Sequence, residues 1–112
     1  RIYEVIDTWV SAPETILRAG GRDTFVALIR LPNKRPQRDF DDTEPLLLFP
    51  GGVPAIRHTL FTWLSGHSFV FGTFRTSEFL AGVPEDGSVE LRLVGRLKDG
   101  HYFSGTQMTR VK

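Results

Sequence analysis

Short runs of β-branched and aromatic residues, separated by glycine or proline about every ten residues, dominate the hydrophobic pattern of this chain. Residues 23–31, DTFVALIRL, are apolar at odd and even positions alike, which predicts a central strand. Residues 88–97 instead alternate, with apolar side chains at the odd positions, as expected of a strand with one buried face. This spacing of short strands is typical of an all-β sandwich or barrel.

The remaining segments fit the same pattern. Gly72, inside an aromatic run, predicts a bulge or a close approach of neighbouring chains. Residues 76–82 are the best helix candidate, because Thr76 or Ser77 can cap the free amides and Gly82 can end the turn. We therefore expect about seven to eight strands with one short helical turn. Further strands are predicted at residues 1–10, 14–17, 45–49, 53–64 and 68–74.

The last two strands are predicted to form a hairpin whose register follows from the burial of Phe103 and Val111. A two-residue turn at Asp99 and Gly100 would direct both apolar side chains to solvent, because a slip of one residue exchanges the two faces of a strand. A three-residue loop over residues 98–100, with its glycine in a left-handed bulge, keeps both side chains on the core face. We therefore predict the longer loop.

This register pairs Gly95 with Phe103, so that the phenylalanine ring covers the space left by the glycine. It also places Arg96 opposite Tyr102 on the outer surface, where a cation–π contact contributes about 0.5 to 1 kcal/mol. Both pairs are specific consequences of the three-residue loop.

Composition limits the classes of protein to consider. At 112 residues and 40% hydrophobic content, the chain is expected to form one domain over residues 1–112. Fourteen basic and 13 acidic residues give a net charge of +1, so we expect no nucleic-acid partner. The apolar runs are far shorter than the roughly 20 residues of a membrane span, so we expect no membrane insertion. The absence of cysteine excludes disulfides and thiolate catalysis.

No catalytic constellation is visible in the sequence. His58, His67 and His101 lack the short spacing of metal-binding histidines, and no serine stands in a nucleophile-elbow pattern. The segment GRLKDG at residues 95–100 has the terminal glycines of a phosphate loop, but it lacks the Lys-Ser/Thr pair and the strand-to-helix context. We therefore expect a protein that is not an enzyme, with no catalytic residues and no cofactor.

One acidic cluster is a candidate for calcium. It lies in residues 33–44, the most polar stretch, which we expect to form a long exposed connection. Carboxylates at alternate positions suit a hard cation such as calcium, but the glycine and distant glutamate of an EF-hand are missing. The alternative, which we prefer, is a solvated loop whose acids offset the neighbouring basic residues, with no metal bound. The candidate ligands are Asp39, Asp41, Asp42 and Glu44.

Aromatic residues offer a second candidate site. Tyr3, Trp9, Trp63 and Tyr102 would form a flat sugar-binding platform if several of them were exposed on one face. Burial in the core of a sandwich is the alternative, and it is the more common place for such side chains. Parity along the strands does not tell whether Trp9 and Trp63 lie together.

The final hairpin carries a family resemblance. The stretch VELRLVGRLKDGHYFSGTQMTRV, residues 89–111, resembles the closing hairpin of Ig-like β-sandwich modules of secreted and surface-attached bacterial and archaeal proteins. FVALIRLP and FVFGTFRTSEF extend the likeness upstream, whereas Gln107 and Thr109 depart from the usual aspartate and aliphatic residue. The resemblance implies an Ig-like antiparallel β-sandwich and a secreted or cell-surface location. It implies no catalytic motif.

The N-terminal segment, RIYEVIDTWV at residues 1–10, suggests a mode of assembly. It precedes the family-like region and is rich in β-prone residues, so we consider it an N-terminal extension or an exchanged strand that adds to the sheet of an identical subunit. The alternatives are pairing within its own sheet or a linker from a preceding domain. Because the chain begins at Arg1 without a leader segment, we expect it to be a processed piece of a larger protein.

These observations favour a non-catalytic extracellular module with a structural or interaction role, such as a self-assembling filament or surface subunit, whose partner is a protein. The alternative is a carbohydrate-binding accessory domain of a secreted enzyme, with a polysaccharide partner. Exposed coplanar aromatic rings would favour the alternative, whereas concentration-dependent assembly would favour the first function.

Overall fold

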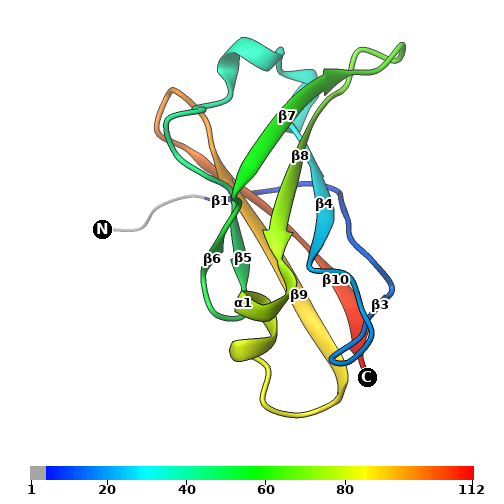
Figure 1. The fold of residues 1–112 in the computed structure, drawn as a ribbon. Helices are drawn as coiled ribbons and strands as arrows, with labels where there is room; N and C mark the ends of the chain where they lie inside the picture. Colours follow the sequence, from blue (N-terminus) through cyan, green and yellow to red (C-terminus); the bar gives the residue numbers. More distant parts are fainter. Residues whose placement is uncertain (1–4) are drawn as a thin grey trace.

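The structure is a computed structural model that describes residues 5–112, and it is mostly β (Figure 1). The described residues contain one α-helix, α1 (Thr76–Ala81), and two single-turn 3-10 helices, η1 (Pro32–Lys34) and η2 (Gln37–Asp39). The all-β expectation is therefore confirmed. The strands are β1 (Val5–Asp7), β2 (Val10–Ser11), β3 (Thr15–Ile16), β4 (Thr24–Arg30), β5 (Leu47–Phe49), β6 (Val53–Pro54), β7 (Arg57–Thr62), β8 (Ser68–Arg75), β9 (Gly87–Arg96) and β10 (Tyr102–Val111).

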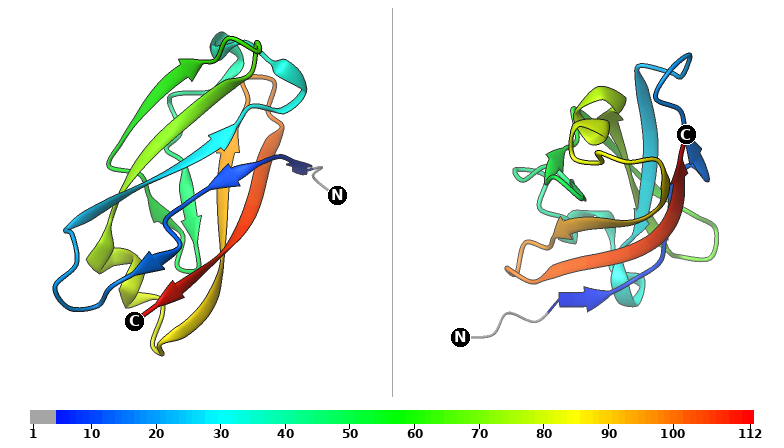
Figure 2. Two further views of the ribbon diagram at one scale, coloured as in Figure 1. Left: turned by 90° about the vertical axis from the view of Figure 1, so that its right-hand side faces the viewer. Right: turned by 90° about the horizontal axis from the view of Figure 1, so that it is seen from below.

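The strands form two sheets that enclose a common core (Figures 1 and 2). One sheet has the order β1-β10-β9-β5-β6, with β3 also paired to β10, and the other has the order β2-β4-β8-β7. Apolar side chains of both sheets meet between them, because each strand directs alternate residues inward. The largest fully buried side chains include Ile29, Val70 and Phe74 of the second sheet and Leu48, Leu97 and Phe103 of the first.

The closing hairpin has the predicted register. Phe103 pairs with Gly95, and the N–H of Leu97 donates to the carbonyl of His101. Gly100 has a φ of +94°, the left-handed conformation that the three-residue loop requires. A Cβ atom at residue 95 would lie 2.6 Å from Cζ of Phe103, which shows how closely the ring covers this glycine.

The predicted contact across the outer side of this hairpin is also present. The guanidinium of Arg96 lies 5.9 Å from the ring centre of Tyr102. Val111 is 1% exposed and therefore belongs to the core, as the parity of the strand predicted. The sequence thus contained enough information to define this hairpin completely.

Strand β4 lies between β2 and β8, so the prediction of a central strand is confirmed, but only one face of the strand is buried. Ala27 and Ile29 are buried, but Val26 is 49% exposed and Leu28 is only partly buried. The reason is that no further layer of the described chain packs on the outer side of this sheet. The apolar residues at even positions of β4 therefore belong to a surface.

The N-terminal segment changes sheets twice. Residues 5–7 pair in parallel with β10, residues 10 and 11 pair antiparallel with β4, and residues 15 and 16 return to β10 in parallel. The single strand predicted at residues 1–10 is therefore wrong within its described part, and two pairings are parallel in an otherwise antiparallel arrangement. Residues 1–4 lie outside the described residues.

A side chain of β10 substitutes for a strand partner where the N-terminal segment crosses between sheets. The amide of Gln107 accepts a hydrogen bond from the N–H of Ala12 at 2.9 Å and donates one to its carbonyl at 2.7 Å. Thr109 continues the contact by donating to the carbonyl of Pro13. Gln107 and Thr109 thus hold this crossing through hydrogen bonds to the backbone.

The connection at residues 33–44 is not the wholly exposed loop that its polarity predicted. Phe40 is 1% exposed, packs edge to face with the ring of Phe103, and forms an isolated bridge with Leu97. The two 3-10 turns bring this aromatic ring into the core, so the loop closes one end of the sandwich.

The predicted helix is present, but its predicted cap is wrong. Gly82 ends the helix as expected, whereas Arg75 occupies the N-cap position and no side chain caps the first turn. Thr76 is instead 8% exposed, and its N–H donates to the carbonyl of Asp23. The helix therefore continues directly from β8.

Candidate interaction surface

The outer face of the sheet β2-β4-β8-β7 carries a row of aromatic side chains. The register pairs Arg30 with Phe69, and Phe69 with Phe61. Trp9 joins the same row, because the N–H of Arg30 donates to its carbonyl, and its ring lies 5.9 Å from that of Phe69. Phe71 stands one row further along, with its ring 6.2 Å from that of Phe61.

Trp63 extends this row at the end of β7. Its ring lies 5.6 Å from that of Phe61, two residues earlier on the same side of the strand. Leu64, in the turn after it, is 100% exposed. We call the outer positions Trp9, Phe61, Trp63, Phe69 and Phe71 the aromatic face.

The aromatic face leaves a large apolar area in water. Trp9, Phe61 and Trp63 are 49%, 40% and 57% exposed. With about 150 to 250 Å² for each such side chain, these three leave on the order of 300 Å² of aromatic surface exposed. Val26 adds to it on the neighbouring strand. The largest apolar patch on a monomer covers about 300 to 600 Å² and is often functional, so this face is a candidate contact surface.

The rings of this face are inclined to one another. The planes of Trp9 and Phe69 meet at 80°, and those of Phe61 and Trp63 meet at 58°. A sugar ring stacks on a flat surface, whereas the rings of this face are inclined to one another and do not form one plane. The arrangement therefore favours a protein partner over a polysaccharide.

The charge around the aromatic face is positive. Arg30 lies within it and Arg57 beside it on β7, and neither belongs to an ion pair among residues 5–112. In the hairpin turn, burial lowers the pKa of His67, and the nearby charges of Arg30 and Lys34 lower it further. The outward positions of β4, β7 and β8 include no acidic residue.

The structure brings together two of the four predicted aromatic site residues. Trp9 and Trp63 lie on the aromatic face, separated by Phe69 and Phe61. Tyr102 belongs to β10 on the other sheet, where it contacts Arg96, and Tyr3 lies outside the described residues. Sequence reasoning missed Phe61 and Phe69. Within the strand predicted at residues 53–64, Phe61 alternates with His58 and Leu60 and so belongs to the opposite side, which is the signal that could have found it.

The acidic cluster is held by basic side chains and turns. Asp39 contacts Arg35 at 3.7 Å, and Asp41 and Glu44 contact Arg96 at 3.5 and 3.3 Å. Asp42 is exposed. No group of three or more histidine, aspartate or glutamate side chains within residues 5–112 is placed to hold a metal ion. Three of the four candidate ligands therefore lie against arginine side chains, and the fourth is exposed.

Two aspartates near this loop predict acid-sensitive stability. Hydrogen bonds from the Thr43 hydroxyl and N–H lower the pKa of Asp41, and the backbone N–H of His101 lowers the pKa of Asp99. As the pH falls, the two carboxylates therefore take up protons in the unfolded chain before they do so in the folded chain. Their contribution to the free energy of unfolding is complete above about pH 4 and is lost below it.

We expect the free energy of urea unfolding to decrease from pH 5 to pH 2.5, and to decrease less in Asp99→Asn. Asp42→Asn is the matched control, because Asp42 is exposed and belongs to no ion pair among residues 5–112. Equal slopes in Asp99→Asn and the parent chain would refute this assignment.

No family model, curated protein or solved structure matches this chain. Within residues 5–112, no helix has the length and apolar character needed to cross a membrane. Function must therefore be argued from the surfaces themselves.

Proposed function

We propose that this chain is a non-catalytic interaction module of the Ig-like β-sandwich class that binds a partner protein through the aromatic face. The exposed row of aromatic rings between Trp9 and Trp63 is the observation that carries the proposal. Interface cores are enriched in tryptophan, phenylalanine and arginine, which is the composition of this face.

The strand order supports the Ig-like assignment. Sheet β2-β4-β8-β7 corresponds to the order A-B-E-D, and β10-β9-β5 corresponds to G-F-C, with β6 as an added strand. The chain lacks the cysteine pair of antibody domains, and β5 carries no tryptophan. The assignment therefore rests on topology together with the resemblance of the closing hairpin. By that resemblance, we propose a secreted or cell-surface location.

The charge of the face defines the partner. Arg30 and Arg57 are unpaired within the described residues, and no acidic residue stands on the outward positions of the three longest strands of this sheet. A second copy of the same face would bring arginine against arginine, which is unfavourable. The partner we propose therefore combines apolar side chains, which pack against the exposed rings, with acidic groups that meet the arginines.

Selection of peptide ligands tests this proposal. A displayed library of random peptides is selected on the full chain, and the binding of the selected peptides is then measured on the parent chain and on the double variant Phe61→Ser/Trp63→Ser. Selected peptides should be rich in acidic and apolar residues, and their dissociation constants should rise about 30-fold on the double variant, as expected when interface hot spots are lost. Met108→Ser is the control, because Met108 is also 57% exposed but lies on the other sheet.

The proposal fails if the selected peptides bind the double variant as tightly as the parent chain. Carbohydrate binding is the alternative function. The exposure of three aromatic rings on one face also favours it. The test is electrophoresis of the chain in gels that contain a soluble polysaccharide. If the polysaccharide retards the parent chain but not Trp9→Ser, the ligand of this face is a sugar and not a protein. Peptide binding and retardation by polysaccharide both report on the aromatic face. Together they therefore show whether its ligand is a protein or a sugar.

A further inference from the structure

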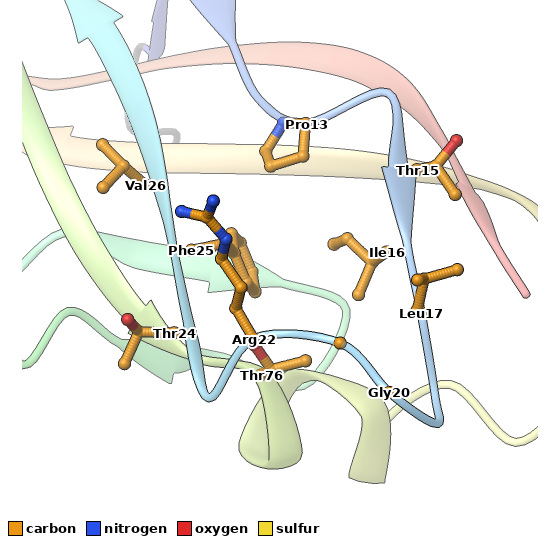
Figure 3. Close-up of a pocket in the computed structure, with 11 residues that line it drawn as sticks. Pro13, Thr15, Ile16, Leu17, Gly20, Arg22, Thr24, Phe25, Val26 and Thr76 are labelled. Carbon is orange, nitrogen blue, oxygen red and sulfur yellow. The ribbon is translucent and has the colours of Figure 1, made fainter.

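A groove of about 640 Å³ lies where the two sheets separate, between β3 and β4 (Figure 3). Its walls are mostly apolar, with Pro13 and Ile16 on one side and Phe25 and Val26 on the other. Arg22 also lines it and belongs to no ion pair among residues 5–112. The groove is distinct from the aromatic face, which lies further along β4.

The groove exists because β2 covers only part of the edge of β4. Pairing with β4 ends at Ser11, after which the chain crosses to β10. Residues 24–27, the first half of β4, are therefore left with no strand on that side in the described part of the chain.

The hydrogen-bond pattern identifies which peptide groups face this open edge. Leu31 and Asp23 bond to the β8 side, so odd residues of β4 are directed there, and Arg30 bonds to Trp9 on the other side. Because the direction of bonding alternates along an antiparallel strand, the N–H and C=O groups of Thr24 and Val26 point to the open edge. Such an edge, beside an apolar groove, is a template for one added strand.

We propose that residues 1–4 of a second copy of this chain, Arg1-Ile2-Tyr3-Glu4, occupy this groove as an added strand along residues 24–27. Four extended residues span about 13 Å, which is the length of the open edge. Ile2 or Tyr3 supplies an apolar side chain for the space between Ile16 and Phe25. Glu4 supplies the negative charge for Arg22.

The donor must be another copy, because a chain cannot reach its own groove. β1 begins opposite Tyr102, whereas β3, which borders the groove, pairs with Arg110 and Val111 at the other end of β10 (Figure 2). These points are eight residues apart along the strand, or about 26 Å, twice the reach of four residues. The donated segment and the groove are different surfaces, so the contact is heterologous and repeats head to tail. In this proposal it builds an open chain of copies and does not close into a ring.

Sedimentation velocity of the full chain at rising concentration tests this contact. The weight-average mass should increase past that of a dimer, with weak affinity because a four-residue strand buries far less than a standard interface. Arg22→Glu and Glu4→Arg should each raise the dissociation constant about tenfold or more by placing like charges together. The combined variant Glu4→Arg/Arg22→Glu should restore assembly, whereas Arg38→Glu should leave it unchanged.

A chain that stays monomeric up to about 1 mM, an assembly that stops at the dimer, or equal assembly by Arg22→Glu and the parent chain would overturn the proposal. Failure of this test does not affect the function proposed for the aromatic face. The variant that tests that function, Phe61→Ser/Trp63→Ser, changes no residue of the groove or of the donated segment.

Discussion

Replacing Phe103 with alanine should lower the free energy of unfolding by about 3 to 5 kcal/mol. Phe103 is fully buried, its ring lies against Gly95, and it packs edge to face with Phe40. Its loss would leave a cavity that neither the glycine nor the loop closed by Phe40 can fill. Since small domains are stable by about 5 to 15 kcal/mol, this change alone can remove much of the stability.

A double-mutant cycle keeps this prediction testable if the alanine variant does not fold. Gly95→Ala should destabilise the parent chain, because its methyl group meets the ring of Phe103 at 2.6 Å. The same change should cost less in a Phe103→Leu background, with a coupling energy of about 0.5 to 3 kcal/mol measured by urea unfolding. Strict additivity of the two changes would show that the ring does not cover the glycine.

Gly105→Ala should cost about 3 kcal/mol, at the upper end of the range for overpacking. A Cβ atom at this position would collide with the carbonyl oxygen of Thr8 and would lie 2.6 Å from Cγ1 of Val10. The carbonyl belongs to the backbone, so it cannot move aside as a flexible side chain would. The N-terminal segment would therefore separate from β10.

Hydrogen exchange locates this effect. The N–H groups of Thr8 and Arg30 bond to Ser104 and Trp9, respectively, and both should lose protection in Gly105→Ala. Thr106→Ala, at the exposed neighbouring position, should change stability by no more than about 0.5 kcal/mol. Unchanged protection of Thr8 in Gly105→Ala would contradict the packing described for this glycine.

The closing hairpin could be predicted in detail because its information is local. Two apolar residues on the return strand, Phe103 and Val111, are compatible with only one loop length, and Gly100 supplies the left-handed conformation which that loop needs. Once the loop length is set, the register of the hairpin pairs Gly95 with Phe103. Nothing outside residues 87–111 was needed for this inference.

The aromatic face could be predicted only in part, because it depends on pairing between distant segments. Phe61 and Trp63 stand two residues apart in the strand predicted at residues 53–64, so their shared side could have been predicted locally. Trp9 joins them only through the pairing of β2 with β4 and of β4 with β8, which spans most of the chain. Parity within one strand carries no information about which sheet that strand enters.

The crossing of the N-terminal segment was also beyond local reasoning. Residues 5–11 look like one continuous strand because β-prone residues run through them. The chain leaves one sheet and enters the other between Asp7 and Val10, where Thr8 bonds to both sheets through the carbonyls of Ser104 and Arg30. Thr8, a polar residue within a run of β-prone residues, was the local sign that the chain passes from one sheet to the other here.

The central claim is that the aromatic face is the binding surface, and amide chemical-shift mapping tests it most directly. The full chain is titrated with an acidic peptide obtained by the selection described above. The account predicts that the largest shifts fall on Trp9, Arg30, Phe61 and Phe69, at the centre of the row of rings. Shifts confined to β9 and β10, on the opposite sheet, would contradict it.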